Sequence, residues 1–117
     1  MPYALIVFYC FLWTLIPTLT LISPPLDVVE MLAWGQSFEW GYYKHPPLPA
    51  WLADSAYRMV GGHIVGVYAL SQICILLTFY YELNLAKLIL QDDRRASFAT
   101  FFLMGVYYYS YPTPEFN

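Results

Sequence analysis

Long uncharged runs alternate with short polar stretches along this chain. Residues 1–26, 64–81 and 96–111 contain no Asp, Glu, Lys or Arg. A helix of about 20 apolar residues crosses the hydrocarbon core of a bilayer. Within lipid such a run must be helical, because an unpaired backbone polar group there costs several kcal/mol. The pattern therefore predicts an all-α membrane protein with about three spans, at residues 3–22, 64–89 and 96–111.

The predicted loop at residues 24–62 has its own helical pattern. Apolar residues recur at helical spacing over 28–38, while Asp27 and Glu30 fall on the opposite face. Such a helix is expected to lie in the membrane interface with its polar face toward water, at a depth that suits Trp34 and Trp40. We expect Gly41 to end this helix and a second helix to cover residues 49–59.

Asp27 and Glu30 allow two interpretations. Asp-x-x-Glu is close to a capping box, in which each side chain satisfies an unpaired backbone N–H at the start of a helix. Three-residue spacing on a helix also aims both carboxylates in nearly the same direction. One of them would then serve as a general base at the membrane surface. The local pattern leaves both interpretations open.

Lys44 and His45 stand directly before Pro46–Pro47, which forces extended backbone and keeps His45 out of the helical region. A cation beside an imidazole suits an anionic phosphate. The alternative is that Lys44 reaches lipid headgroups and His45 caps a backbone group. Arg58 lies four residues after Asp54, a spacing that favours a local surface ion pair.

The basic residues set the expected orientation. Three of the five Lys and Arg residues flank the short loop at 90–95, and the other two lie within 24–62. Because Lys and Arg favour short cytoplasmic loops, the 90–95 loop is expected in the cytoplasm. The 24–62 loop and the C-terminal residues would then share the outer side.

Composition supports this class of protein and excludes others. Hydrophobic residues make up 60% of the 117 residues and charged residues 11%, whereas soluble domains carry roughly 25% charged residues. The net charge of -3 and the scattered basic residues argue against nucleic-acid binding. The sequence has no metal signature, no glycine-rich phosphate loop and no serine nucleophile motif.

The polar loop resembles a known family. The resemblance lies in the order Asp27-x-x-Glu30, Trp34-Gly35 and Trp40-Gly41-Tyr42-Tyr43-Lys44-His45-Pro46-Pro47-Leu48-x-x-Trp51. After an apolar span, this order is similar to the N-terminal region of the membrane glycosyltransferases of family 39. These include protein O-mannosyltransferases and lipid A aminoarabinose transferases. The similarity is closest to bacterial relatives that resemble the galacturonosyltransferases acting on lipopolysaccharide, and residues 112–117 look like the start of their second outer loop.

The resemblance implies a fold and a reaction. The fold would be the multi-span GT-C fold, and the donor a polyprenyl-phosphate sugar. Transfer to a lipid, lipopolysaccharide or protein acceptor would occur on the outer, periplasmic face of the bacterial inner membrane. Asp27 occupies the place of the proposed catalytic aspartate of the family. The resemblance also allows a divalent metal in the complete enzyme.

Glu30, Lys44, His45, Arg58 and Glu115 are the residues expected to contact the donor phosphate or the acceptor. The family places a polar pair before Pro-Pro for metal or lipid-phosphate contacts. Lys44 departs from this pattern, since relatives have an acidic residue there, and this favours direct phosphate pairing over a metal ligand.

Family members are much longer and have many more spans. The chain is therefore expected to be an N-terminal fragment that is inactive alone. A small three-span structural or accessory membrane protein is the alternative.

Overall fold

The computed structural model describes residues 1–106 and 109–113, and these residues contain five α-helices and no strand. The expected all-α fold class is confirmed. The helices are α1 (Pro2–Thr20), α2 (Leu26–Gly35), α3 (Pro47–Met59), α4 (Val65–Leu90) and α5 (Asp93–Met104).

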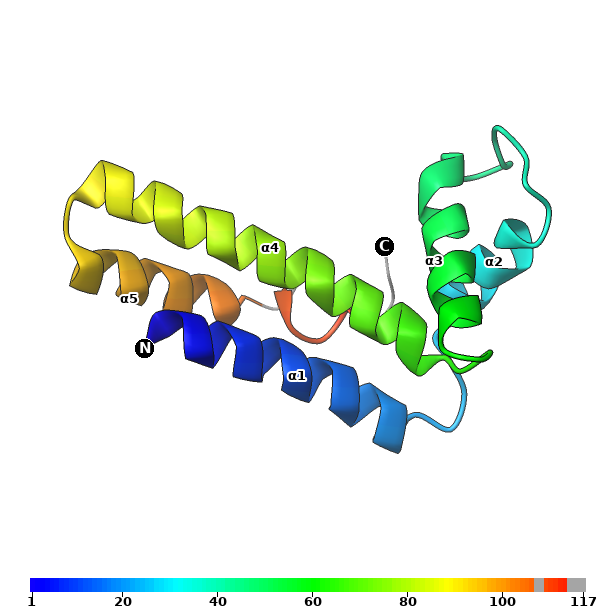
Figure 1. Cartoon of the computed structure of the whole chain (residues 1–117), viewed down its shortest axis with the longest axis horizontal. Coiled ribbons are helices and arrows are strands. Elements are labelled where there is room, and N and C mark those ends of the chain that lie inside the picture. Colours follow the sequence, from blue (N-terminus) through cyan, green and yellow to red (C-terminus); the bar gives the residue numbers. More distant parts are fainter. Residues whose placement is uncertain (107–108, 114–117) are drawn as a thin grey trace.

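Within the described residues, α1 and α4 are the two helices long and apolar enough to cross a membrane. Figure 1 shows α1 and α5 each lying alongside α4 along the long axis of the molecule, with α4 running opposite to the other two. The 12 residues of α5 measure about 18 Å, less than a hydrocarbon core of roughly 30 Å. The third span, expected at 96–111, stays a prediction, because residues 107–108 lie outside the described part.

A compact apolar core joins these three helices. Ile6 and Cys10 of α1, Phe79 and Leu83 of α4, and Ala96 of α5 are all buried in it. The hydroxyl of Tyr9 lies 3.0 Å from the carbonyl oxygen of Met104 and 2.8 Å from that of Tyr109. These contacts bring the chain after α5 back toward α1.

Helices α2 and α3 form a separate lobe at one end of the spans, here called the α2–α3 lobe (residues 26–59). Figure 1 shows that α3 lies across the axis of α4. The core of the lobe consists of buried residues from α2, α3 and the first turn of α4: Val28, Met31, Ala50, Ala53, Val67 and Tyr68. The lobe is thus packed directly on the end of a predicted span.

Two glycines permit this close packing. A Cβ on Gly35 would lie 2.5 Å from the carbonyl oxygen of Ala50 and 2.5 Å from Asp54 Cβ. A Cβ on Gly66 would meet the carbonyl oxygen of Ala56 in the same way. Real Cβ atoms do not approach other atoms this closely, so any side chain at either position forces the helices apart.

The structure corrects the expected bounds of the lobe helices. Helix α2 ends at Gly35 instead of Gly41, because the backbone N–H and the hydroxyl of Ser37 both donate to the carbonyl oxygen of Trp34 and close the last turn there. Helix α3 begins at Pro47, two residues earlier than expected. Proline is favoured in a first helical turn, since its missing N–H would have no partner there.

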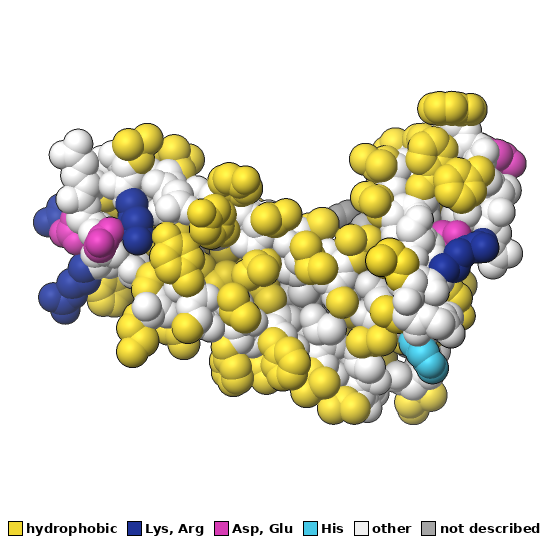
Figure 2. All heavy atoms as spheres, in the orientation of Figure 1, with side chains coloured by type: hydrophobic (Ala, Val, Ile, Leu, Met, Phe, Trp, Pro, Cys, Tyr) yellow, Lys and Arg dark blue, Asp and Glu magenta, His cyan; other side chains and the backbone are white. Residues whose placement is uncertain are grey.

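The opposite end of the molecule carries a charged turn. Figure 2 shows basic and acidic side chains gathered at the end remote from the α2–α3 lobe. Asp92 caps α5: the backbone N–H groups of Arg95 and Arg94 donate to its carboxylate at 3.2 and 2.8 Å. These two bonds hold the pKa of Asp92 below its ordinary value. Lys87 lies 3.5 Å from Asp93, which joins α4 to the start of α5.

Candidate functional site

Asp27 lies in the first turn of α2, directly after the chain leaves α1. The helix begins at Leu26 with Pro25 as its N-cap, so Asp27 is inside the helix and the capping-box interpretation is wrong. Both Asp27 and Glu30 are half-buried. A carboxylate in the first turn of a helix interacts favourably with the positive end of the helix dipole.

Glu30 forms an ion pair with Lys44. The Nζ atom of Lys44 lies 3.4 Å from Oε1 of Glu30, and their side chains are 55% and 28% exposed. The contact ties the loop between α2 and α3 back onto α2. An exposed pair of this kind contributes about 1 kcal/mol or less. Lys44 can therefore exchange Glu30 for another anion at small cost.

His45 lies next to a stacked pair of aromatic rings in the α2–α3 lobe. Its ring lies 5.4 Å from that of Trp34, which is stacked on Tyr42 at 5.7 Å. The Tyr42 backbone N–H donates to the carbonyl oxygen of His45 at 3.3 Å, and the Tyr42 hydroxyl donates to the carbonyl oxygen of Ser37 at 3.0 Å. These contacts fix the loop that presents His45 and Lys44.

Arg58 forms the expected pair with Asp54. Its Nε atom donates to Oδ2 of Asp54 at 2.7 Å, and the Asp54 side chain is 6% exposed while that of Arg58 is 65% exposed. The pair is not a surface pair, because the carboxylate lies buried beneath Gly35 of α2. The structure thus brings Glu30 and Lys44 together, and it places Arg58 on a different helix. Glu115 lies outside the described residues.

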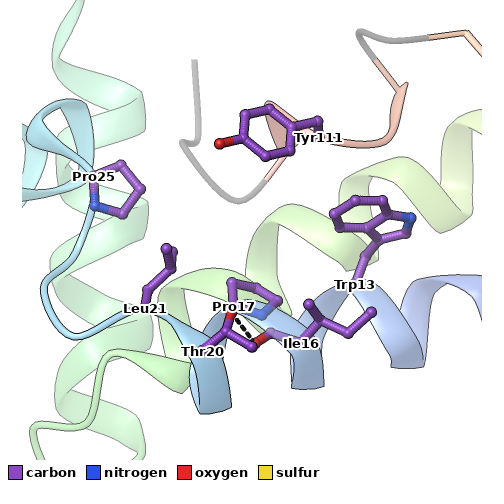
Figure 3. A pocket seen from close by; sticks show the side chains of 7 residues that line it. All are labelled: Trp13, Ile16, Pro17, Thr20, Leu21, Pro25 and Tyr111. Atoms are coloured by element: carbon purple, nitrogen blue, oxygen red, sulfur yellow. Dashed lines mark hydrogen bonds between the residues drawn. The ribbon is translucent and has the colours of Figure 1, made fainter.

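A groove of about 110 Å³ opens beside the last turns of α1. Figure 3 shows its side chains converging from α1, from the segment before α2 and from Tyr111. Its lining is mostly apolar and consists of Trp13, Ile16, Pro17, Thr20, Leu21, Pro25 and Tyr111. Pro25 lies two residues before Asp27 in the chain. Sequence reasoning missed this groove, since Tyr111 reaches it from a distant part of the chain while the other lining residues lie within residues 13–25.

A buried polar cluster ties the end of the described chain to α4. The Ser71 hydroxyl donates to the carbonyl oxygen of Thr113. Nε2 of Gln72 donates to the Thr113 hydroxyl oxygen at 2.7 Å. Sequence reasoning missed this cluster as well. The available signal was a pair of adjacent polar residues within an otherwise apolar run.

Among the described residues, no group of three or more His, Cys, Asp or Glu side chains is placed to hold a metal ion.

Comparison with known proteins identifies one family. The model of the family described as dolichyl-phosphate-mannose-protein mannosyltransferase matches residues 44–117. The match begins at Lys44 and includes α3, α4 and α5, whereas Asp27 and Glu30 precede it. No curated protein and no solved structure matches the chain.

Proposed function

The chain belongs to the dolichyl-phosphate-mannose-protein mannosyltransferase family, and we propose from this that it forms part of a family 39 enzyme of the GT-C type. The proposed reaction moves a sugar from a polyprenyl-phosphate donor to a lipid, lipopolysaccharide or protein acceptor. We place it on the outer face of the bacterial inner membrane. Two long apolar helices and the family together make the chain an integral membrane protein.

The proposal depends most on the position of the Lys44–Glu30 pair. A polyprenyl-phosphate donor keeps its tail in lipid, so its phosphate stays at headgroup height. The α2–α3 lobe is packed on the end of α4, where a span would leave the bilayer. A half-exposed lysine on this lobe, held by one weak ion pair, is available to a phosphate at that level.

We assign Lys44 the phosphate contact and Arg58 a supporting one. The phosphate leaving the sugar gathers negative charge, and a nearby cation stabilises that charge in the transition state. Arg58 keeps its Nε on Asp54, and its side chain is 65% exposed. His45 and Glu30 complete the polar surface around Lys44, and Glu115 is proposed to approach from the second outer loop.

Asp27 is the proposed general base. The acceptor hydroxyl is a weak nucleophile, and a carboxylate that takes its proton in the transition state accelerates transfer. The apolar groove at the end of α1 suits the first isoprene units of the donor, since its lining is mostly hydrocarbon. The groove, Asp27 and the Glu30–Lys44 pair would then follow one another from the end of α1 along α2.

Replacing Lys44 with glutamine tests the phosphate contact. A hydrogen bond to a charged group contributes roughly 1.5–3 kcal/mol, so kcat/KM for the donor is expected to fall about tenfold or more. The measurement is transfer of labelled sugar from a polyprenyl-phosphate donor in membranes that contain the protein expressed from its own gene. Lys44→Arg keeps the charge and should retain most activity. Equal rates for Lys44→Gln and wild type would remove Lys44 from the site, and absence of transfer by the wild-type enzyme of which the chain forms part would contradict the reaction itself.

Single-cysteine labelling tests the orientation. Cys10 and Cys74 are first replaced by alanine, and Lys44→Cys is compared with Arg94→Cys at the charged turn. A membrane-impermeant maleimide added to intact spheroplasts is expected to label position 44 and to reach position 94 only after permeabilisation. Labelling of position 44 from the cytoplasmic side alone would exclude an outer active site.

A further inference from the structure

Three aromatic rings form an exposed cluster on the α2–α3 lobe, here called the aromatic cap (Phe38, Trp40 and Trp51). Phe38 is stacked on Trp51 with ring centroids 5.4 Å apart, and Trp40 meets Trp51 edge-on at 5.6 Å. Trp51 is fixed on α3, whereas Phe38 and Trp40 are 69% and 90% exposed. These two rings leave large apolar surfaces uncovered by the described protein.

The aromatic cap continues onto one face of α3. Leu48 and Leu52 are four residues apart, so they share a helix face, and they are 59% and 41% exposed. In Figure 2 hydrophobic side chains cover the end of the lobe farthest from α1 and the side that faces α4. Glu39 is exposed and lies between Phe38 and Trp40 in the chain, and an acidic side chain borders the hydrophobic surface of the lobe in that view. The patch is therefore apolar and bordered by polar surface, as at sites where proteins bind partners or membranes.

The position of the lobe favours a membrane over a partner protein as the surface that covers this patch. Its core includes Val67 and Tyr68 of α4, and α3 lies across the axis of α4, as Figure 1 shows. A helix that crosses a span at its end lies along the bilayer surface. The apolar side toward α4 then faces lipid. Tryptophan is enriched at this depth, because its ring is apolar and its N–H is polar.

Trp51 gives an independent indication. Its indole N–H is buried and has no acceptor among the described residues. Buried polar groups in folded proteins nearly always have a partner. Ester carbonyl and phosphate oxygens of lipids are acceptors of the kind that this N–H lacks within the described residues.

We propose that the aromatic cap, together with Leu48 and Leu52, inserts into the boundary between headgroups and acyl chains. The leaflet concerned is the one in which α1 ends and α4 begins. This contact holds the α2–α3 lobe down on the bilayer and sets the height of Lys44, four residues after Trp40. The proposal concerns a lipid-binding surface and does not require that the chain transfer sugar.

Depth-dependent fluorescence quenching tests this contact. A protein that keeps Trp40 and carries phenylalanine at the other three tryptophan positions is reconstituted into phosphatidylcholine vesicles with bromine atoms near the headgroup end of the acyl chains. Trp40 emission should shift to shorter wavelength and lose most of its intensity, while aqueous iodide should have little effect. The matched control keeps Trp34, which is covered by Tyr42 and His45 and should be quenched less by the brominated lipid.

A second reporter guards against misfolding of the triple substitution. Trp40→Cys, made with alanine at the two native cysteines, carries an environment-sensitive fluorophore and leaves the other tryptophans in place. Quenching of this fluorophore by brominated lipid supports the proposal. Quenching of both reporters by iodide and not by lipid would overturn it, and would leave the aromatic cap in water as a surface for a soluble partner or a sugar.

Discussion

Replacing Gly35 with valine is expected to destabilise the α2–α3 lobe strongly, because α2 and α3 meet at this position without room for a side chain. A Cβ at position 35 would stand 2.5 Å from the carbonyl oxygen of Ala50 and 2.5 Å from Asp54 Cβ. One of these is backbone of α3 and the other is the first side-chain atom of a buried residue. Neither can move without shifting the helix.

The expected cost is about 3 kcal/mol, at the upper end for overpacking a close contact. Separation of α2 from α3 also exposes the buried Asp54 carboxylate and loosens the Glu30–Lys44 pair. The gain in helix propensity when glycine is replaced is about 1 kcal/mol at most and offsets only part of this cost. The variant should therefore melt at a lower temperature in detergent micelles, as followed by the near-ultraviolet signal of the lobe aromatics.

Gly41→Val is the matched control. A Cβ at Gly41 has nothing within 4 Å, and its backbone does not adopt a positive φ, unlike Gly61 and Gly62. It should leave the melting temperature nearly unchanged. Equal melting of Gly35→Val and wild type would mean that the lobe helices pack less closely than the structure shows.

The uncharged runs were sufficient to predict the long helices. Helices α1 and α4 cover nearly the same residues as the first two expected spans, because a long uncharged apolar run has few alternatives to a helix. The lobe was harder to predict. The apolar pattern continues past Gly35 to Phe38, yet close packing at Gly35 and the bonds from Ser37 to Trp34 end the helix first.

The contacts within the candidate site depend on tertiary structure. Asp54 and Arg58 are four residues apart on one helix, so their pair follows from local spacing. Glu30 and Lys44 are separated by 14 residues and a loop, and no local pattern predicts that they meet. Thr113 contacts Ser71 and Gln72, which are more than 40 residues earlier in the chain, and no local pattern predicts this contact either. Local rules predict elements well, and they do not predict which elements touch.

The proposed base leads to the largest expected effect on activity. Asp27→Asn keeps the size and shape of the side chain and removes its ability to accept a proton. If Asp27 is the general base, transfer should fall by about 10²–10⁴-fold. The loss should appear in kcat, and KM for the donor should change little, because the interaction is made in the transition state. Membrane insertion and the melting temperature should stay as in wild type.

Glu30→Gln separates this role from a general effect of negative charge on α2. Glu30 lies three residues after Asp27 on the same helix, and it is paired with Lys44. Losing it frees Lys44 and should alter donor binding without abolishing turnover. A large kcat loss in Asp27→Asn alone therefore identifies the base. Similar losses in both variants would instead show that α2 needs its carboxylates to hold the loop that carries Lys44, and full activity in Asp27→Asn would remove the residue from catalysis.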